Sequence, residues 1–299
     1  MKLATTTSDF SAYTANQLES MEYIAKAGFK YIDYNFGRDY AEHSGIYGDD
    51  FYGYIEKVKA HTEKLGVKLV QSHSPMGKPL LDENGEFSEA TRKCIEACGL
   101  WGIENIVIHT GYRAGLTPEE TFEENKLFFM PLLKEAEKYN VTILVENFNK
   151  MSVDGLYWID NATDLLKMIE CVNHPLLHAV WDAGHANMQP MPQDEELRIL
   201  GSHVRALHIQ DNMGDNDTHN FPYCGTLSLD SLMHGLEDIG YKGYFTFECG
   251  NLFVPATGRR PFEKDERLIV PPLALKLKAE ELLYEIGKTV LTQYGCYEE

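Results

Sequence analysis

The feature that most constrains the fold of this chain is a regular alternation of short β-type runs with longer amphipathic stretches. Eight runs rich in Val, Ile, Tyr and Phe have the length of β-strands: Lys2–Thr6, Tyr31–Phe36, Lys68–His73, Asn105–Thr110, Thr142–Phe148, His178–Asp182, Val204–Gln210 and Tyr244–Cys249. A segment with helical periodicity follows each run: Asn16–Ala27, Asp50–Leu65, Ser88–Trp101, Pro118–Tyr139, Ala162–Cys171, Glu195–Gly201, Leu229–Ile239 and Pro272–Tyr294. An eightfold strand–helix alternation is typical of a closed parallel barrel.

The main alternative is an open, doubly wound sheet, which alternates in the same way. No Gly-x-Gly-x-x-Gly follows the first predicted strand, so the dinucleotide-binding form of that fold has little support. The length of 299 residues suits a barrel, which typically uses about 250 residues as one unit. We therefore predict an α/β fold, a (β/α)8 TIM barrel, in which residues 1–299 form a single domain with a long C-terminal helix.

Net charge, apolar runs and cysteine content limit which binding partners and which cellular compartment are expected for this protein. The chain has 27 Lys and Arg against 46 Asp and Glu, and its formal net charge of −19 disfavours a general nucleic-acid binder. The first residues contain no apolar secretion signal, and no apolar run approaches the roughly 20 residues of a membrane span. Six cysteines are too sparse for a disulfide framework. We predict a cytoplasmic protein with reduced cysteines and without a membrane or nucleic-acid partner.

Side chains that are able to bind a metal occur at the ends of four consecutive predicted strands. Glu146, Asp182 and Glu248 lie at the ends of the fifth, sixth and eighth strands, and His208 lies near the end of the seventh. In a parallel barrel these strand ends are neighbours around one mouth, so we expect the four side chains to converge. Carboxylates and one imidazole suit a divalent ion such as Mn²⁺, Mg²⁺, Co²⁺ or Zn²⁺.

The simpler interpretation is that each charged residue marks a strand leaving the core for water. The four together argue against it, because apolar strand residues precede each of them and would carry them into the barrel. Several buried carboxylates without a cation would be very costly.

Five further polar residues are expected at the same rim: His73, His109, His185, Asp217 and His219. They are candidates for contacts to a substrate; the alternative is that some are hydrogen-bonded plugs of the barrel top or loop residues. Long connections over 37–48, 212–226 and 251–269 also follow strand ends, where barrel enzymes build their sites.

Aromatic residues near the mouth have two interpretations. They could form apolar walls against a sugar, or they could be ordinary packing of the barrel top; they are Tyr34, Phe36, Phe148, Trp181 and Phe253. Arg259 and Arg260 could meet a phosphate or belong to a solvated loop. The predicted last helix has more apolar positions than one barrel-facing stripe needs, which favours a homo-oligomer; simple coverage of the barrel is the alternative.

The pattern Glu146, Asp182-x-x-His185, His208-x-x-Asp211, Asp217-x-His219 and Glu248 resembles the xylose-isomerase-like barrel superfamily. It is most similar to the sugar phosphate isomerase/epimerase group. The resemblance implies one divalent metal ion, Mn²⁺ first, held by Glu146, Asp182, His208 and Glu248. It implies that the two glutamates also act as the acid/base pair on a keto-sugar, cyclitol or sugar phosphate, through a metal-bound enediolate, with His185 on a substrate hydroxyl.

Two other activities stay open. One is a metal-dependent lyase or dehydratase of a keto-sugar or 3-oxo-glycoside, which would use the same proton abstraction. Ketose 3-epimerases usually carry an arginine soon after the strand-seven histidine, and residues 208–214 of this chain contain none, so the sequence departs from the specific 3-epimerase pattern. An endonuclease-IV-type phosphodiesterase with three zinc ions is the other. Its ligand set is present by residue type: His73, His109, Glu146, Asp182, His185, His208, Asp217, His219 and Glu248. The acidic net charge and the lack of basic rim clusters count against it.

Overall fold

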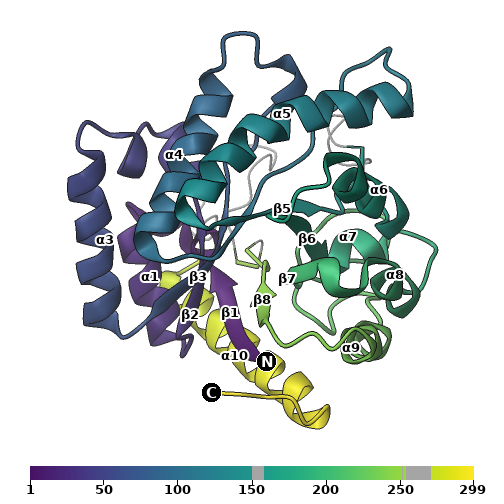
Figure 1. Ribbon diagram of the computed structural model, residues 1–299. Helices are drawn as coiled ribbons and strands as arrows, with labels where there is room; N and C mark the ends of the chain where they lie inside the picture. The colour runs from purple at the N-terminus through teal and green to yellow at the C-terminus, as the bar shows by residue number, and fades with distance from the viewer. Residues whose placement is uncertain (150–157, 251, 254–270) are drawn as a thin grey trace, which may run out of the picture.

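The computed structural model describes residues 1–149, 158–250, 252–253 and 271–299 (Figure 1). Eight strands form one parallel sheet in the order β7-β6-β5-β4-β3-β2-β1-β8. They are β1 (Lys2–Thr6), β2 (Tyr31–Asn35), β3 (Lys68–His73), β4 (Asn105–Val107), β5 (Thr142–Glu146), β6 (Leu177–Asp182), β7 (Val204–His208) and β8 (Tyr244–Phe247). The backbone N–H of Ile209 donates to the Thr246 carbonyl at 2.8 Å, and that of Glu248 donates to the Ile209 carbonyl at 3.0 Å. These bonds join the two ends of the sheet, so the predicted (β/α)8 barrel is confirmed.

Helices surround the strands, as Figure 1 shows. They are α1 (Gln17–Lys26), α2 (Gly37–Ala41), α3 (Phe51–Leu65), α4 (Glu86–Trp101), α5 (Pro118–Tyr139), α6 (Ala162–Val172), α7 (Ala183–Asn187), α8 (Gln193–Leu200), α9 (Leu229–Asp238) and α10 (Leu273–Gln293). The short helices α2 and α7 were not expected from the sequence. Helix α5 begins as predicted: Thr117 and Glu120 form a reciprocal capping box, and Pro118 follows the cap.

Several strands end earlier than their apolar runs predict. The run after Asn105 was expected to stay extended to Thr110, but β4 ends at Val107. The run after Val204 was expected to reach Gln210, but β7 ends at His208. Just beyond these ends the backbone still bonds to neighbouring strands, since the N–H groups of Ile108 and Ile209 donate to the carbonyls of Leu144 and Thr246. The polar side chains there bond within the site; the Gln210 amide, for example, donates to Asp217 Oδ1 at 2.7 Å.

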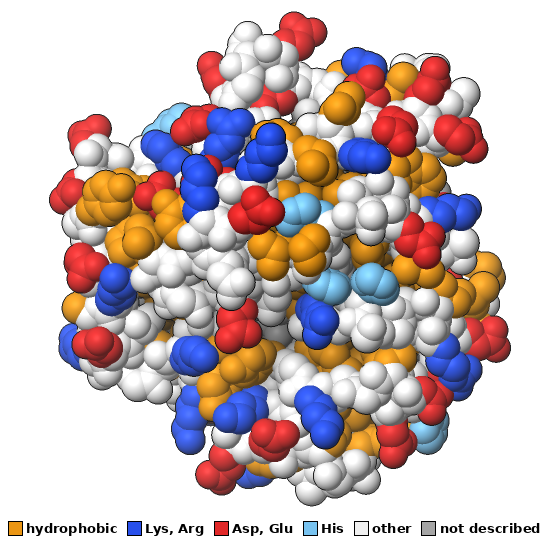
Figure 2. Space-filling model, in the orientation of Figure 1, with side chains coloured by type: hydrophobic (Ala, Val, Ile, Leu, Met, Phe, Trp, Pro, Cys, Tyr) orange, Lys and Arg blue, Asp and Glu red, His pale blue; other side chains and the backbone are white. Residues whose placement is uncertain are grey.

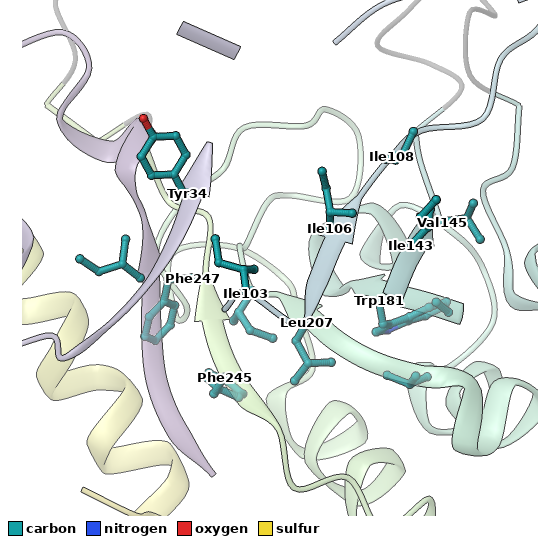
Figure 3. Close-up of a cluster of buried hydrophobic side chains, with 14 of the residues drawn as sticks. Tyr34, Ile103, Ile106, Ile108, Ile143, Val145, Trp181, Leu207, Phe245 and Phe247 are labelled. Atoms are coloured by element: carbon teal, nitrogen blue, oxygen red, sulfur yellow. The ribbon is translucent and has the colours of Figure 1, made fainter. Parts of the chain in front are cut away.

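The alternation of side chains along each strand separates two packing layers. Outward side chains of β4 to β8, such as Ile143, Val145 and Leu207, belong to the large core between sheet and helices (Figure 3). A smaller cluster fills the barrel itself and consists of Val107, Leu144, Val180 and Ala206. Residues two positions further along β5, β6 and β7 therefore point inward at the top of the barrel.

This alternation corrects one interpretation of the aromatic residues. Tyr34, Phe36 and Trp181 are not walls of the site, because all three are fully buried. Tyr34 and Phe36 pack against Trp101 of α4, with ring centroids 4.9 and 5.8 Å away. The Trp181 indole N–H donates to Gln193 Oε1 of α8 at 3.1 Å. Tyr34 and Trp181 each sit one residue away from an inward-facing position, so they face the helices.

Helix α10 packs against β1, and the two chain ends lie close together in Figure 1. The Glu298 backbone N–H donates to the Met1 carbonyl at 2.8 Å. Gly287 allows the close approach of α10, since a Cβ there would lie 2.6 Å from Leu3 and 2.7 Å from Phe247. All six cysteines are free thiols. Within the described residues, no helix has both the length and the apolar character needed to cross a membrane. Oligomeric state and compartment stay predictions.

Candidate active site

The four strand-end residues meet at one point. Glu146 ends β5, Asp182 ends β6, His208 ends β7 and Glu248 directly follows β8. One potential ligand atom from each lies within 4.8 Å of the others. The strand register brings Asp182 opposite His208. Glu146, Asp182 and His208 are buried, whereas the Glu248 side chain is 18% exposed. We call these residues the four-residue cluster.

Glu146 lies among histidine rings. Its Oε2 is 2.5 Å from His109 Nε2 and 3.8 Å from His73 Nε2, and its Oε1 is 2.9 Å from His208 Nδ1. Burial raises the pKa of Glu146, but the charge of His208 and the hydrogen bonds from His109 and His208 hold it well below its usual value. The group is therefore a buried carboxylate that stays ionised.

Asp182 has one engaged oxygen and one without a partner. Its Oδ1 caps helix α7 by accepting from the His185 backbone N–H at 2.7 Å. Its Oδ2 is buried and has no hydrogen-bond partner in the described part of the chain. Burial raises the pKa of Asp182 to about 7; the attraction of His185 opposes this, and the nearby charges of Glu146 and Glu248 add to it.

His208 and Glu248 complete the cluster from the other side. His208 Nδ1 lies 3.6 Å from Glu248 Oε2. Burial lowers the pKa of His208, but the carboxylates of Glu248 and Glu146 raise it well above its usual value. A cavity of about 330 Å³ opens beside Glu248 and His219 and gives a small molecule access to this edge of the cluster.

The predicted rim residues on the β6 and β7 side form a chain of hydrogen bonds. His185 Nε2 lies 3.1 Å from Asp217 Oδ2, and His219 Nε2 lies 3.3 Å from Asp217 Oδ1. Despite burial, Asp182 and Asp217 raise the pKa of His185 to about 9, and Asp217 and Glu248 raise the pKa of His219 to about 10. Both nitrogens of His185 are engaged within the protein, since Nδ1 lies 2.9 Å from the Asn147 carbonyl. A direct contact from His185 to a substrate therefore requires it to exchange a partner.

The rim residues on the β3 and β4 side form a second group. The rings of His73 and His109 pack edge to face with centroids 4.8 Å apart, and His73 Nδ1 lies 2.7 Å from the Ser74 carbonyl. The ring of Phe148 contacts those of His109 and His185, each at 4.7 Å. Phe148 thus supplies an apolar surface at the cluster, and Phe253 remains 40% exposed. Arg259 and Arg260 lie outside the described residues.

Three polar residues that support the cluster were missed in the sequence. The Asn147 side chain accepts from the Asp182 backbone N–H at 2.8 Å and donates to its carbonyl at 2.9 Å. The Gln210 amide lies 3.4 Å from Asp182 Oδ1, and Gly184 makes room for it, because a Cβ there would lie 2.1 Å from the Gln210 side chain. Asp33, buried in β2, is the third. A polar residue inside a buried run is the signal that could have found Asp33.

The donor set fits a divalent cation. Three carboxylates and one imidazole offer hard and borderline ligands within 4.8 Å of one another. The unpartnered Asp182 Oδ2 is a buried oxygen for which a cation would compensate. Two more groups also bring potential ligand atoms this close: His73, His109 and Glu146, and His185, Asp217 and His219.

Comparison with known proteins agrees with this architecture. The sequence profile of the xylose isomerase-like TIM barrel family matches residues 21–260. The chain belongs to this family. Fructoselysine 3-epimerase of Escherichia coli O157:H7 is 35% identical to this chain over 150 residues. That match spans 49% of this chain and about half, 51%, of the relative's length.

Solved structures share the fold of this xylose isomerase-like barrel. A D-tagatose 3-epimerase-like protein superposes with a TM-score of 0.72 at 20% identity, over 98% of this chain and 100% of its own. An AP endonuclease of family 2 from Brucella melitensis superposes with a TM-score of 0.68 at 17% identity, over 84% of this chain and 93% of its own. At these identities the likeness concerns the fold alone.

Proposed function

We propose that this xylose isomerase-like barrel is a divalent-metal-dependent isomerase or epimerase of a keto-sugar, cyclitol or sugar phosphate. The observation that carries the proposal is the convergence of Glu146, Asp182, His208 and Glu248, with ligand atoms within 4.8 Å, at the end of the barrel where such enzymes build their sites. The 35% identity to a fructoselysine 3-epimerase over half of the chain supports a sugar-derived substrate.

The four-residue cluster would hold the metal, with Mn²⁺ as the first candidate and Mg²⁺, Co²⁺ or Zn²⁺ as alternatives. When bound, a divalent ion would supply Lewis-acid stabilisation of negative charge on substrate oxygens. Glu146 stays ionised, so it is ready to accept a proton from the carbon next to the carbonyl. Glu248 borders the cavity, which supports assigning to it the proton transfer at another face of the same substrate. Positioned acid/base groups of this kind typically contribute about 10²–10⁴-fold.

His73, His109, His185, Asp217 and His219 would orient the substrate around this pair. Acidic neighbours raise the pKa of His185 to about 9 and that of His219 to about 10. The ring nitrogens of both already lie near protein oxygens, so each would exchange a partner to donate to a substrate. We infer that they stabilise negative charge that develops on substrate oxygens, and that Phe148 packs against the C–H face of the sugar.

The test combines metal analysis with a product screen. The purified protein is assayed for bound metal and incubated with fructoselysine, D-tagatose, D-allulose and L-ribulose under mass- and stereochemistry-resolved detection. We expect one exchangeable divalent ion per chain and an isomeric product of unchanged mass. A product that has lost water or an aglycone would instead identify the lyase or dehydratase. A protein that binds no divalent ion would refute the proposal.

The second candidate is an endonuclease-IV-type zinc phosphodiesterase. The observation that favours it is that the nine residues of its ligand set form three groups, each with ligand atoms within 4.8 Å. Against it, the net charge is −19, and on the face shown in Figure 2 Lys and Arg side chains are interspersed with Asp and Glu. Three zinc ions per chain together with cleavage of abasic-site DNA would establish this activity; one ion with sugar turnover would exclude it.

A further inference from the structure

Beneath the four-residue cluster, the interior of the barrel is unevenly polar. Strands β4 to β7 place apolar side chains there, from Val107 to Ala206. Strands β2, β3 and β8 instead contribute Asp33, Gln71 and Thr246, which are at most 2% exposed. We call these three residues the polar layer. Because buried polar groups are costly without partners, a polar layer inside a barrel calls for a reason.

Asp33 is incompletely satisfied by its own layer. Register pairs it with Gln71, whose Nε2 donates to Asp33 Oδ2 at 2.7 Å. Asp33 Oδ1 is buried and has no hydrogen-bond partner within the described chain. The alternation of inward and outward side chains along β2 therefore puts the Asp33 carboxylate inside the barrel, where it can accept at least one more hydrogen bond.

His208 has a buried ring nitrogen that could donate a hydrogen bond to this carboxylate. Its Nδ1 faces the carboxylates and lies 2.9 Å from Glu146 Oε1, so its Nε2 points away from them. Nε2 is buried without a hydrogen-bond partner among the described residues, and the carboxylate oxygen Asp33 Oδ2 lies 3.7 Å from it. A shift of about 0.8 Å would bring the two atoms to the usual N–H···O separation.

The ring chemistry of histidine links the two observations. A neutral imidazole has one N–H and one lone pair, so a lone pair at Nδ1 requires the proton at Nε2. A carboxylate that accepts from Nε2 fixes this tautomer and prevents the ring from turning over. We propose that Asp33 is a positioning residue that accepts a hydrogen bond from His208 Nε2 and holds Nδ1 towards Glu146 and Glu248. This role rests on the metal site of the proposed function.

The experiment measures Zn²⁺ affinity by calorimetry in variants of the polar layer. Asp33→Leu combined with Gln71→Leu replaces both partners by apolar groups of similar shape, which preserves packing better than removing one partner. We expect this variant to bind Zn²⁺ about 10–100-fold more weakly than the wild type. Asp33→Asn retains an acceptor oxygen and should therefore lose clearly less Zn²⁺ affinity than the double variant. Thr246→Val, which removes a buried hydroxyl of the same layer that has no hydrogen-bond partner among the described residues, is the matched control and should keep wild-type affinity.

Nitrogen NMR of the Zn²⁺-loaded proteins gives a second readout that a merely structural role would not change. In the wild type and in Asp33→Asn, His208 should show a metal-bound Nδ1 and a protonated Nε2; the double variant should show both ring orientations or exchange broadening. Wild-type affinity and an unchanged His208 spectrum in the double variant would overturn the role of Asp33 alone. Absence of Zn²⁺ binding by the wild type would overturn the metal site itself, so the two failures are distinguishable.

Discussion

Replacing Glu248 by glutamine separates chemistry from folding at this site. The backbone of Glu248 is anchored independently of its carboxylate: its N–H donates to the Ile209 carbonyl at 3.0 Å, and its own carbonyl lies 2.7 Å from His219 Nδ1. The side chain is 18% exposed, and its Oε2 lies 3.6 Å from His208 Nδ1. Glutamine preserves the backbone anchors and the side-chain volume but removes the charge and the basic oxygen.

The expected loss of activity follows from the acid/base role. Removal of a positioned acid/base group costs about 10²–10⁴ in rate, which is about 3–5 kcal/mol of transition-state free energy. Stability should change little, because two effects of the lost charge oppose each other. Glu248 attracts the charges of His208 and His219, and it repels Asp182. We expect the unfolding free energy to stay within about 1 kcal/mol, or roughly 2–4 °C in Tm.

The assay follows exchange of the substrate proton next to the carbonyl for solvent deuterium by NMR, with bound metal measured in the same samples. Glu195→Gln, which neutralises an exposed carboxylate on α8, is the matched control and should exchange at the wild-type rate. Because Glu248 is also a proposed metal ligand, the Glu248→Gln variant is assayed at a metal concentration that saturates it. Loss of exchange with metal bound and Tm unchanged fits the proposed acid/base role. Exchange within tenfold of the wild type would refute the glutamate-pair mechanism.

Three further predictions address pH, packing and metal. Burial raises the pKa of Asp39 from 3.8 to about 6, so the native state holds a proton that the unfolded chain has released, and stability falls as pH rises through that window. As pH rises from about 4 to about 6, the unfolding free energy of Asp39→Asn should increase relative to that of the wild type by up to about 3 kcal/mol. Urea unfolding at several pH values measures this difference; a difference that does not change with pH would contradict it. Gly287→Ala should cost about 1–3 kcal/mol, measured by the same method, since its Cβ would meet Leu3 and Phe247 at 2.6 and 2.7 Å; an unchanged midpoint would refute the close packing of α10. A divalent ion at 100 times its Kd should stabilise the protein by about 2.7 kcal/mol in thermal unfolding, and a chelator should abolish the gain; a Tm insensitive to both would count against the site.

The sequence predicts the barrel and the convergence of the four-residue cluster because both follow from strand periodicity. Parallel strands of a barrel all end on one rim, so a carboxylate at the end of a strand is placed by the fold itself. The orientation of His208 was beyond such reasoning, since it depends on Glu146 on one side of the ring and Asp33 on the other. The pairing of His185 with Asp217 likewise depends on how the loop after β7 returns to the barrel. Side-chain contacts between distant segments have no local signature.

The same alternation explains why stability and chemistry can be altered separately in this barrel. In β5, Ile143 and Val145 pack outward in the large core, whereas Leu144 and Glu146 point into the barrel. A slip of one residue would turn Glu146 to the helices, so the apolar partners of Ile143 and Val145 hold the glutamate in its inward orientation. Substitution of the outward residues should therefore lower the free energy of unfolding and leave the chemistry of the folded fraction intact. Substitution of Glu146 should instead change metal binding or rate before it changes stability.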